Sequence, residues 1–364
     1  MSNLDCLEQR LAEFTGRRHC IAMGRAATSL WLIMRQLHGA RRDKIVFPAT
    51  LCLSPVVVAR LCHLEPLFCD VKSSSGNLCP ATLDELLSAR SDICGVVAAH
   101  LYGQPADIVE IAAICRKHGT PLIEDVAQAL GARIGDRPTG SFGDVAVLSF
   151  GHTKILDAGD GGAVVTDDSA LARDLRAQRD RLPSRPPQTE EWSEQCRRAY
   201  YAIAHVAQSQ IRLRRLLGQL GQLIPELYCY ALDSKVAERI WFMLDDLDEE
   251  MCHRRTLAEC YGKALAGLPI EVLDMEPGGV PWRFSFTVEP SRRNTLLTAL
   301  RSDCFDASAW YPAVPPFFGD YPDWIGRWPA AAYLDAGIVN LWVDRNTSEE
   351  RALACCSAIA RTFQ

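Results

Sequence analysis

The sequence has no C-x-x-C pair, no long apolar run and no excess of positive charge. Close cysteine pairs are typical of structural zinc sites, so we expect no metal site. A membrane-spanning helix needs about 20 apolar residues, so we expect no membrane span. The chain carries 39 basic and 45 acidic residues, a net charge of −6, which argues against nucleic acid as a partner.

We expect no secretion signal at the start of the sequence. The segment from Met1 to Phe14 contains charged residues and lacks the apolar stretch of a signal peptide. Fifteen cysteines are scattered between Cys6 and Cys356, many of them in apolar runs, where a free thiol packs as a small hydrophobic group. We therefore expect a cytoplasmic protein whose cysteines remain reduced.

The first half of the chain alternates short apolar runs with amphipathic segments. The pattern predicts strands at residues 44–47, 67–71, 93–99, 121–124, 145–150 and 162–166. Helices are predicted at residues 7–14, 27–37, 54–61, 83–88 and 106–118. Such alternation indicates an α/β fold with a mostly parallel sheet, which binds ligands at the carboxyl ends of its strands.

The composition changes after a turn-rich break at residues 183–188. Residues 183–223 read as a basic helical insert, and residues 234–265 as one helix. A small α+β region follows, with strands at 282–288 and 338–343, helices at 294–300 and 349–363, and a loop at 307–328. We predict a large domain at residues 1–230 and a small C-terminal domain at residues 231–364.

Residues with chemical potential lie near the predicted strand ends. Gly24, Arg25 and Ala26 open a helix, and the N–H groups of a helix N-terminus can bind phosphate. Asp125 ends a strand, where it can pair with a buried cationic nitrogen or simply cap the next helix. Lys154 follows Ser149 by five residues. A lysine in a closed pocket can form a Schiff base, although an isolated lysine is usually a solvated surface group.

The order and spacing of these residues carry more information than any one of them. The glycine-opened helix comes first, Asp125 follows about 100 residues later, and Lys154 comes 29 residues after Asp125. Pyridoxal phosphate needs a phosphate site, a carboxylate for its ring nitrogen and a lysine for its aldehyde. The layout therefore predicts this cofactor.

Five stretches of sequence carry a family resemblance. They are residues 100–107 (HLYGQPAD), 123–129 (IEDVAQA), 140–144 (GSFGD), 149–154 (SFGHTK) and 158–162 (AGDGG). On these motifs the sequence resembles the DegT/DnrJ/EryC1/StrS family of pyridoxal-phosphate-dependent aminotransferases. The resemblance is close over residues 7–168. It implies the fold type I architecture, with a large domain built on a mostly parallel central sheet and a small C-terminal α+β domain.

The resemblance also implies roles for individual residues. Lys154 would form the Schiff base and carry the proton between cofactor and substrate. Asp125 would hold the pyridine nitrogen and Gln128 would approach the ring hydroxyl. Ser149 and the backbone of Gly24, Arg25 and Ala26 would bind the phosphate. Members of the family are typically homodimers with sites at the subunit interface.

Three features depart from the family pattern. Cys52 stands where relatives often place an aromatic ring against the cofactor. The segment 229–232 lacks the family's asparagine that reaches the partner subunit's phosphate, and we hypothesise that Arg25 supplies that contact. The insert at residues 183–223 is longer than the family pattern. It is a helical hairpin covering the dimer edge, a basic surface for an anionic partner such as a carrier protein or a nucleotide, or a surface that contacts a membrane.

We therefore predict an aminotransferase that moves an amino group from an amino acid, glutamate or glutamine, to a keto acceptor. The acceptor would be a keto sugar, a cyclitol or a secondary-metabolite intermediate. Two alternatives stay open. One is a pyridoxal phosphate enzyme of different chemistry (decarboxylation, racemisation or carbon–carbon bond formation), and the other is a non-catalytic binding or regulatory protein.

Overall fold

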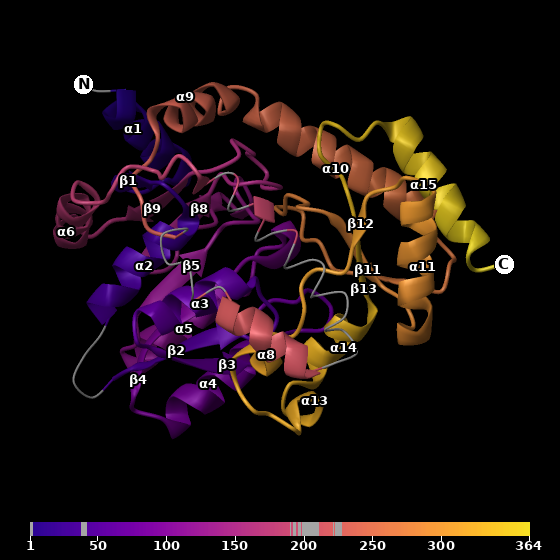
Figure 1. The fold of residues 1–364 in the computed structure, drawn as a ribbon, viewed down its shortest axis with the longest axis horizontal. Coiled ribbons are helices and arrows are strands. Elements are labelled where there is room, and N and C mark those ends of the chain that lie inside the picture. Colours follow the sequence, from indigo (N-terminus) through magenta and orange to yellow (C-terminus); the bar gives the residue numbers. More distant parts are fainter. Residues whose placement is uncertain are drawn as a thin grey trace.

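The computed structural model describes residues 3–37, 42–189, 211–220 and 228–364, together with Glu191, Glu194, Gln195, Arg198 and Gln222. Its centre is a seven-stranded sheet of order β1-β9-β8-β5-β4-β2-β3 (Figure 1). The strands are β1 (His19–Met23), β2 (Lys44–Pro48), β3 (Glu65–Cys69), β4 (Ile93–Ala99), β5 (Leu122–Asp125), β8 (Val145–Ser149) and β9 (Gly162–Thr166). Only β9 runs antiparallel to both neighbours, which confirms the mostly parallel α/β fold.

Helices cover both faces of this sheet. They are α1 (Asn3–Thr15), α2 (Ala26–Leu37), α3 (Leu53–Leu61), α4 (Pro80–Ala89), α5 (Ile108–His118) and α6 (Ser169–Arg179). Successive side chains of a strand point to opposite faces. Ile45 and Phe47 accordingly join the core under α2 and α3, whereas Val46 joins the core under α4 and α5. A short hairpin, β6 (Arg133–Ile134) with β7 (Arg137–Pro138), and the turn η1 (Leu101–Gly103) complete this region.

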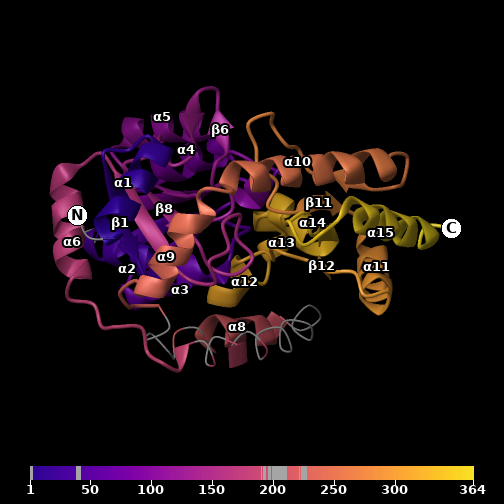
Figure 2. The ribbon, with the colours of Figure 1, turned by 90° about the horizontal axis from the view of Figure 1, so that it is seen from above.

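The C-terminal part builds a second, antiparallel sheet of order β10-β11-β13-β12. Its strands are β10 (Glu271–Val272), β11 (Phe284–Thr287), β12 (Ala307–Ser308) and β13 (Ile338–Leu341). The helices here are α10 (Leu247–Ala264), α11 (Pro290–Ser302), α12 (Pro315–Phe318), α13 (Trp324–Arg327), α14 (Pro329–Gly337) and α15 (Glu349–Arg361). Helices α10, α11 and α15 gather at the end of the molecule away from α6 (Figures 1 and 2).

Two secondary-structure predictions are wrong. The helix predicted over residues 234–265 is broken into α9 (Ser234–Met243) and α10, because α9 packs Val236 and Ile240 against the core beneath the large sheet. From Leu257 onward, α10 instead packs with the small sheet. The predicted loop 307–328 contains β12, α12 and α13. The domain division near residue 230 stays a prediction.

The predicted insert at residues 183–223 lies largely outside the described residues. Helix α8 (Ile211–Leu220) falls within it and lies beside α12 (Figure 2). Arg214 pairs with Asp335 at 2.9 Å, and Arg215 pairs with Asp320. Part of the insert's positive charge is therefore neutralised within the chain. Among the described residues, no helix combines the length and apolar character needed to cross a bilayer.

The cysteines of the described segments are all free thiols. Burial raises the pKa of Cys62, Cys69 and Cys115 to about 12. A thiol with so high a pKa is almost entirely protonated at neutral pH and reacts poorly. These residues therefore act as small hydrophobic core residues, as the sequence predicts.

Glu124 is the most connected polar residue of the large domain and has no exposed surface. Its Oε1 accepts hydrogen bonds from the backbone N–H groups of Phe142 and Gly143, each at 2.6 Å. Its Oε2 accepts one from Gly140 at 2.9 Å and contacts His100 Nε2 at 3.1 Å. The carboxylate thus joins β5, the end of β4 and the loop that precedes β8.

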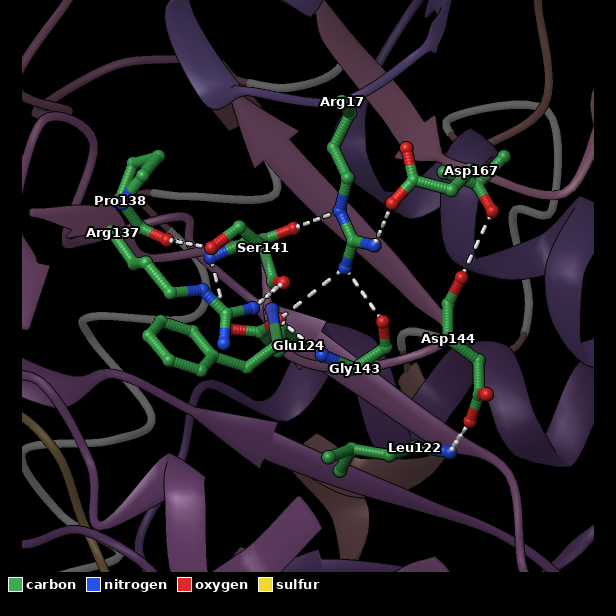
Figure 3. A network of polar contacts seen from close by, with 12 residues as sticks. Arg17, Leu122, Glu124, Arg137, Pro138, Ser141, Gly143, Asp144 and Asp167 are labelled. Carbon is green, nitrogen blue, oxygen red and sulfur yellow. Dashed lines mark hydrogen bonds and ion pairs between the residues drawn. The ribbon is translucent and has the colours of Figure 1, made fainter.

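Arg17 completes this network from the N-terminal side (Figure 3). Its Nη2 lies 3.7 Å from Glu124 Oε1 and donates to the carbonyl of Gly143 at 2.6 Å. Its Nη1 pairs with Asp167 at 2.9 Å. The loop that leads into β8 is therefore held from both sides by a buried ion pair.

We predict that Glu124→Gln destabilises the protein by about 3–5 kcal/mol, because removing one charge of a buried network leaves the other uncompensated. Urea unfolding monitored by circular dichroism measures the change. The control is Glu110→Gln, which alters an exposed carboxylate on α5 and is expected to change the unfolding free energy by less than about 0.5 kcal/mol. A Glu124→Gln protein as stable as the wild type would contradict the network's role.

The same residue predicts an acid sensitivity. Burial alone would raise the pKa of Glu124, but His100 and the N–H groups of Gly143 and Gly140 together lower it below its usual value. A lowered folded-state pKa contributes stability above the ordinary carboxyl pKa and loses it as pH falls through the folded-state value. We expect the unfolding free energy to fall below about pH 4.5 more steeply in the wild type than in Glu124→Gln.

Candidate active site

The strand register brings the predicted site residues to one edge of the sheet. Asp125 is the last residue of β5 and Ser149 the last of β8. Across the next two strands, Ser149 lies opposite Gly162, and Gly162 lies opposite Met23. Gly24 and Arg25 follow Met23 directly, so the helix N-terminus and the predicted phosphate-binding serine share this edge.

Asp125 is a buried carboxylate with 8% of its surface exposed. One oxygen accepts a hydrogen bond from the N–H of Ala127 at 2.9 Å, and the other accepts none from the described residues. Burial raises its pKa, while Lys154 and His100 act in the opposite direction. The alternative role as a helix N-cap is wrong, because turns rather than a helix follow β5.

Lys154 lies on the loop between β8 and β9. This loop is closed by the hydrogen bond from Ala158 N to Phe150 O and by Asp157 accepting from Thr153 N at 2.7 Å. Thr153 has a positive φ of 64°, and its carbonyl accepts a hydrogen bond from Trp282 Nε1 at 2.6 Å. Lys154 itself is half-buried, and its ammonium forms no hydrogen bond or ion pair with the described residues.

Gln128 is held by a residue that follows β4. Its Oε1 accepts a hydrogen bond from the N–H of Tyr102 at 2.9 Å, which leaves its Nε2 without a partner among the described residues. Tyr102 is buried, with φ at 58°, a conformation that non-glycine residues adopt rarely. The backbone is fixed there because Tyr102 OH also accepts a hydrogen bond from Tyr311 N at 3.0 Å.

The N-terminus of α2 is packed tightly by two glycines. A Cβ on Gly162 would lie 2.3 Å from Ala26 N, and a Cβ on Gly24 would lie 2.3 Å from the ring of Tyr230. Glycine is therefore required for the first residue of β9 to approach the start of α2 and for Tyr230 to approach the helix end. Ser149 Oγ, on the neighbouring strand, has no hydrogen-bond partner among the described residues.

A charge cluster lies beside this helix end, centred on Asp160, which is 4% exposed. Asp160 Oδ1 lies 3.4 Å from Arg25 Nε. Its Oδ2 accepts hydrogen bonds from Arg185 Nε at 3.0 Å and from Tyr230 OH at 2.7 Å. One carboxylate and two guanidinium groups leave a net positive charge next to the helix N-terminus, which favours an anion.

The sequence analysis includes Asp160 only within the family motif at residues 158–162 and gives no role to Arg185 or Tyr230. The one available signal was a charged residue inside a run of glycines. Cys52, the residue before α3, is half-buried and packs against the core of the large sheet. Its contact with the cofactor stays a prediction.

The geometry fits pyridoxal phosphate. Four side chains retain bonding capacity: the second oxygen of Asp125, Gln128 Nε2, Ser149 Oγ and Lys154 Nζ. They match the ring nitrogen, ring hydroxyl, phosphate and aldehyde of the cofactor in chemical type. The helix N-terminus with Arg25 adds the positive potential that a phosphate dianion needs.

We predict that Arg25→Ala raises the dissociation constant for pyridoxal phosphate about tenfold or more, because a charge-assisted hydrogen bond to phosphate is lost. Titration of the apoenzyme, followed by fluorescence quenching, measures the change. Arg35→Ala, at the other end of α2, is the matched control. Pyridoxal without phosphate should bind Arg25→Ala and wild type equally. If the variant loses affinity for both forms alike, Arg25 does not contact the phosphate.

Comparison with known proteins gives a consistent result. The model of the DegT/DnrJ/EryC1/StrS aminotransferase family matches residues 2–223. A UDP-N-acetyl-3-dehydro-alpha-D-glucosamine 3-aminotransferase from Acidithiobacillus ferrooxidans is 28% identical, over 98% of this chain and 88% of its own. An L-glutamine:2-deoxy-scyllo-inosose aminotransferase from Micromonospora echinospora is 33% identical, over 73% of this chain and 58% of its own.

Among solved structures, the aminotransferase TlmJ from Streptoalloteichus hindustanus aligns with a TM-score of 0.80 and 21% identity. The alignment covers 100% of this chain and 91% of that one, so the two share the whole fold. A match to the family model over more than half of the sequence, together with this fold, shows that the chain belongs to the DegT/DnrJ/EryC1/StrS family of pyridoxal-phosphate-dependent aminotransferases.

Proposed function

We propose that this aminotransferase carries the amino group of glutamate or glutamine to the ketone of a sugar or cyclitol. The observation that carries the proposal is the pair formed by Asp125, buried at the end of β5, and Lys154, whose ammonium has no partner among the described residues. A pure binding protein has no need of an unpaired lysine opposite a buried carboxylate. This argues against the non-catalytic alternative.

When bound, pyridoxal phosphate supplies an electron sink that makes the proton beside the amino group acidic. Asp125 stabilises the positive charge on the ring nitrogen, since it is buried and one of its oxygens accepts no hydrogen bond from the described residues. Ser149, Arg25 and the N–H groups at the start of α2 hold the phosphate. Gln128 orients the ring through its free amide nitrogen.

Lys154 Nζ is the group that moves the proton. Its loop is fixed at Thr153 by Asp157 on one side and Trp282 on the other, so the side chain that follows is presented from a rigid backbone. Proton transfer by a positioned side chain contributes typically about 10²–10⁴-fold to a rate. The same nitrogen serves in both halves of the reaction, removing the proton from the donor and delivering it to the acceptor carbon.

The acceptor class is supported by the relatives. The names of the two relatives described above specify a nucleotide-linked keto sugar in one case and a keto cyclitol in the other, and the former aligns along almost the whole chain. We also propose a homodimer, as is typical of the family. The carrier-protein role of residues 183–223 has less support, because Arg214 and Arg215 are paired within the chain.

We predict that the wild-type holoenzyme, mixed with glutamate and no acceptor, releases one equivalent of 2-oxoglutarate per site in a single turnover. Lys154→Ala should release it at least about 100-fold more slowly, because no group at that position moves the proton. Rapid quench with detection of 2-oxoglutarate measures both rates. Lys235→Ala, on the exposed face of α9, is the control.

This experiment also separates the remaining enzyme alternative. A decarboxylase would release carbon dioxide from glutamate, and a racemase would yield D-glutamate, in both cases without 2-oxoglutarate. If neither glutamate nor glutamine yields the keto acid in the wild type, the transaminase assignment of this site is contradicted.

A further inference from the structure

Arg283, the residue before β11, is a buried arginine that forms no ion pair with the described residues. It is 2% exposed, and its Nη1 donates to the carbonyl of Trp282 at 3.1 Å. Its Nε is buried and has no hydrogen-bond partner among the described residues. Nη2 likewise donates to none of them. Arginine binds carboxylates bidentately through the guanidinium edge formed by Nε and Nη2. In Arg283 this edge is therefore unused.

Nearby charges act on Arg283 only from beyond ion-pair distance: Asp344 and Asp306 attract it, and Arg254 repels it. The described residues include no carboxylate in ion-pair contact with Arg283. The adjacent Arg254 is paired with Glu250 at 2.7 Å, and Glu250 also contacts Arg345 at 3.0 Å. Burial, followed by the nearby Arg254, lowers the pKa of Arg283 to about 10, so it remains a cation at neutral pH. An unpaired buried charge is costly to keep.

Two indole rings fix the orientation of this cation. The guanidinium carbon lies 4.6 Å from the ring centre of Trp282 and 4.0 Å from that of Trp342. Arginine stacks on aromatic faces through its flat guanidinium, which leaves the edges available for hydrogen bonds. The rings therefore hold the group flat and do not occupy its unused edge.

Contacts of Trp282 connect Arg283 to the active site. The indole N–H donates to Thr153, the residue before Lys154, at 2.6 Å, and the backbone N–H donates to Tyr102 at 3.0 Å. The Trp282 ring stacks on Tyr311 at 5.6 Å. Arg283 thus lies one aromatic ring away from the loop that carries Lys154, on the side of the small domain.

We propose that Arg283 binds a carboxylate group of the substrate through its Nε–Nη2 edge. This inference rests on the proposed function and adds the class of substrate group recognised by the small domain. The carboxylate belongs either to the amino-acid donor or to an acidic sugar acceptor, and the two sources give different experimental results.

The test uses the holoenzyme of the wild type, Arg283→Met, Arg283→Lys and Arg292→Met. Arg292 is exposed and stacks on Phe363 at 5.4 Å, which makes it the matched control. Calorimetry measures the binding of glutarate, an unreactive dicarboxylate of glutamate's length, and of glucuronate, a sugar acid. The glutamate half-reaction gives KM and kcat.

For a donor carboxylate, Arg283→Met should raise the KM for glutamate and the dissociation constant for glutarate about 10- to 100-fold, with kcat nearly unchanged. Arg283→Lys should give an intermediate loss, because a lysine cannot form the bidentate pair. For an acceptor carboxylate, only the binding of glucuronate should weaken. In both cases the melting temperature of Arg283→Met should not fall, since an unpaired buried charge has been replaced by an apolar side chain.

The inference is overturned if glutarate and glucuronate bind Arg283→Met as they bind the wild type, or if the wild type binds neither. It is also overturned if Arg283→Met melts several degrees lower with unchanged KM, which would identify a purely structural residue. A wild type that binds glutarate but yields no 2-oxoglutarate from glutamate would instead contradict the proposed function and leave carboxylate binding by Arg283 standing.

Discussion

Glu124 has no contact with solvent, and a carboxylate in that position must find its hydrogen-bond donors inside the protein. It finds them in the loop before β8 and in His100 after β4, and Arg17 adds an ion pair at 3.7 Å. These bonds fix the strand ends relative to one another. Asp125, the next residue along β5, points to the opposite face because side chains alternate. A structural carboxylate and a predicted cofactor carboxylate therefore follow each other in the sequence with separate roles.

A second buried carboxylate organises the other end of the site. At the N-terminus of α2, Asp160 forms ion pairs with Arg25 and Arg185 and accepts a hydrogen bond from Tyr230. These three residues come from separate parts of the chain. The site is thus enclosed by charge pairs that are satisfied within the protein. The groups proposed to face the cofactor, Lys154 among them, keep unused bonding capacity. This division between satisfied and unsatisfied polar groups distinguishes the scaffold from the reactive surface.

Much of this architecture follows from local sequence signals. The strand at residues 162–166 was predicted with its observed bounds, because a short apolar run that follows a glycine turn and ends before two aspartates has few alternatives. The motif around Lys154 carried the cofactor prediction. By contrast, no local pattern in the sequence predicts the roles of Arg185, Tyr230 and Arg283. The first two act through partners far away in the sequence, and Arg283 is notable because it forms no ion pair with the described residues. The break between α9 and α10 was missed for a related reason: two different cores, not local propensity, decide where the helix ends.

The central claim is that Lys154 is the amine that holds pyridoxal phosphate opposite Asp125. It is tested most directly by reducing the holoenzyme with borohydride, digesting it and locating the cofactor mass by peptide mass spectrometry. The account predicts that the added mass lies on the peptide that contains Lys154. As a control, the wild type and Asp125→Asn are each reduced as the apoenzyme. The label should then be absent from that peptide in both, because no cofactor is present. Cofactor found on another lysine of the wild type, or no covalent label at all after reconstitution, would contradict the account.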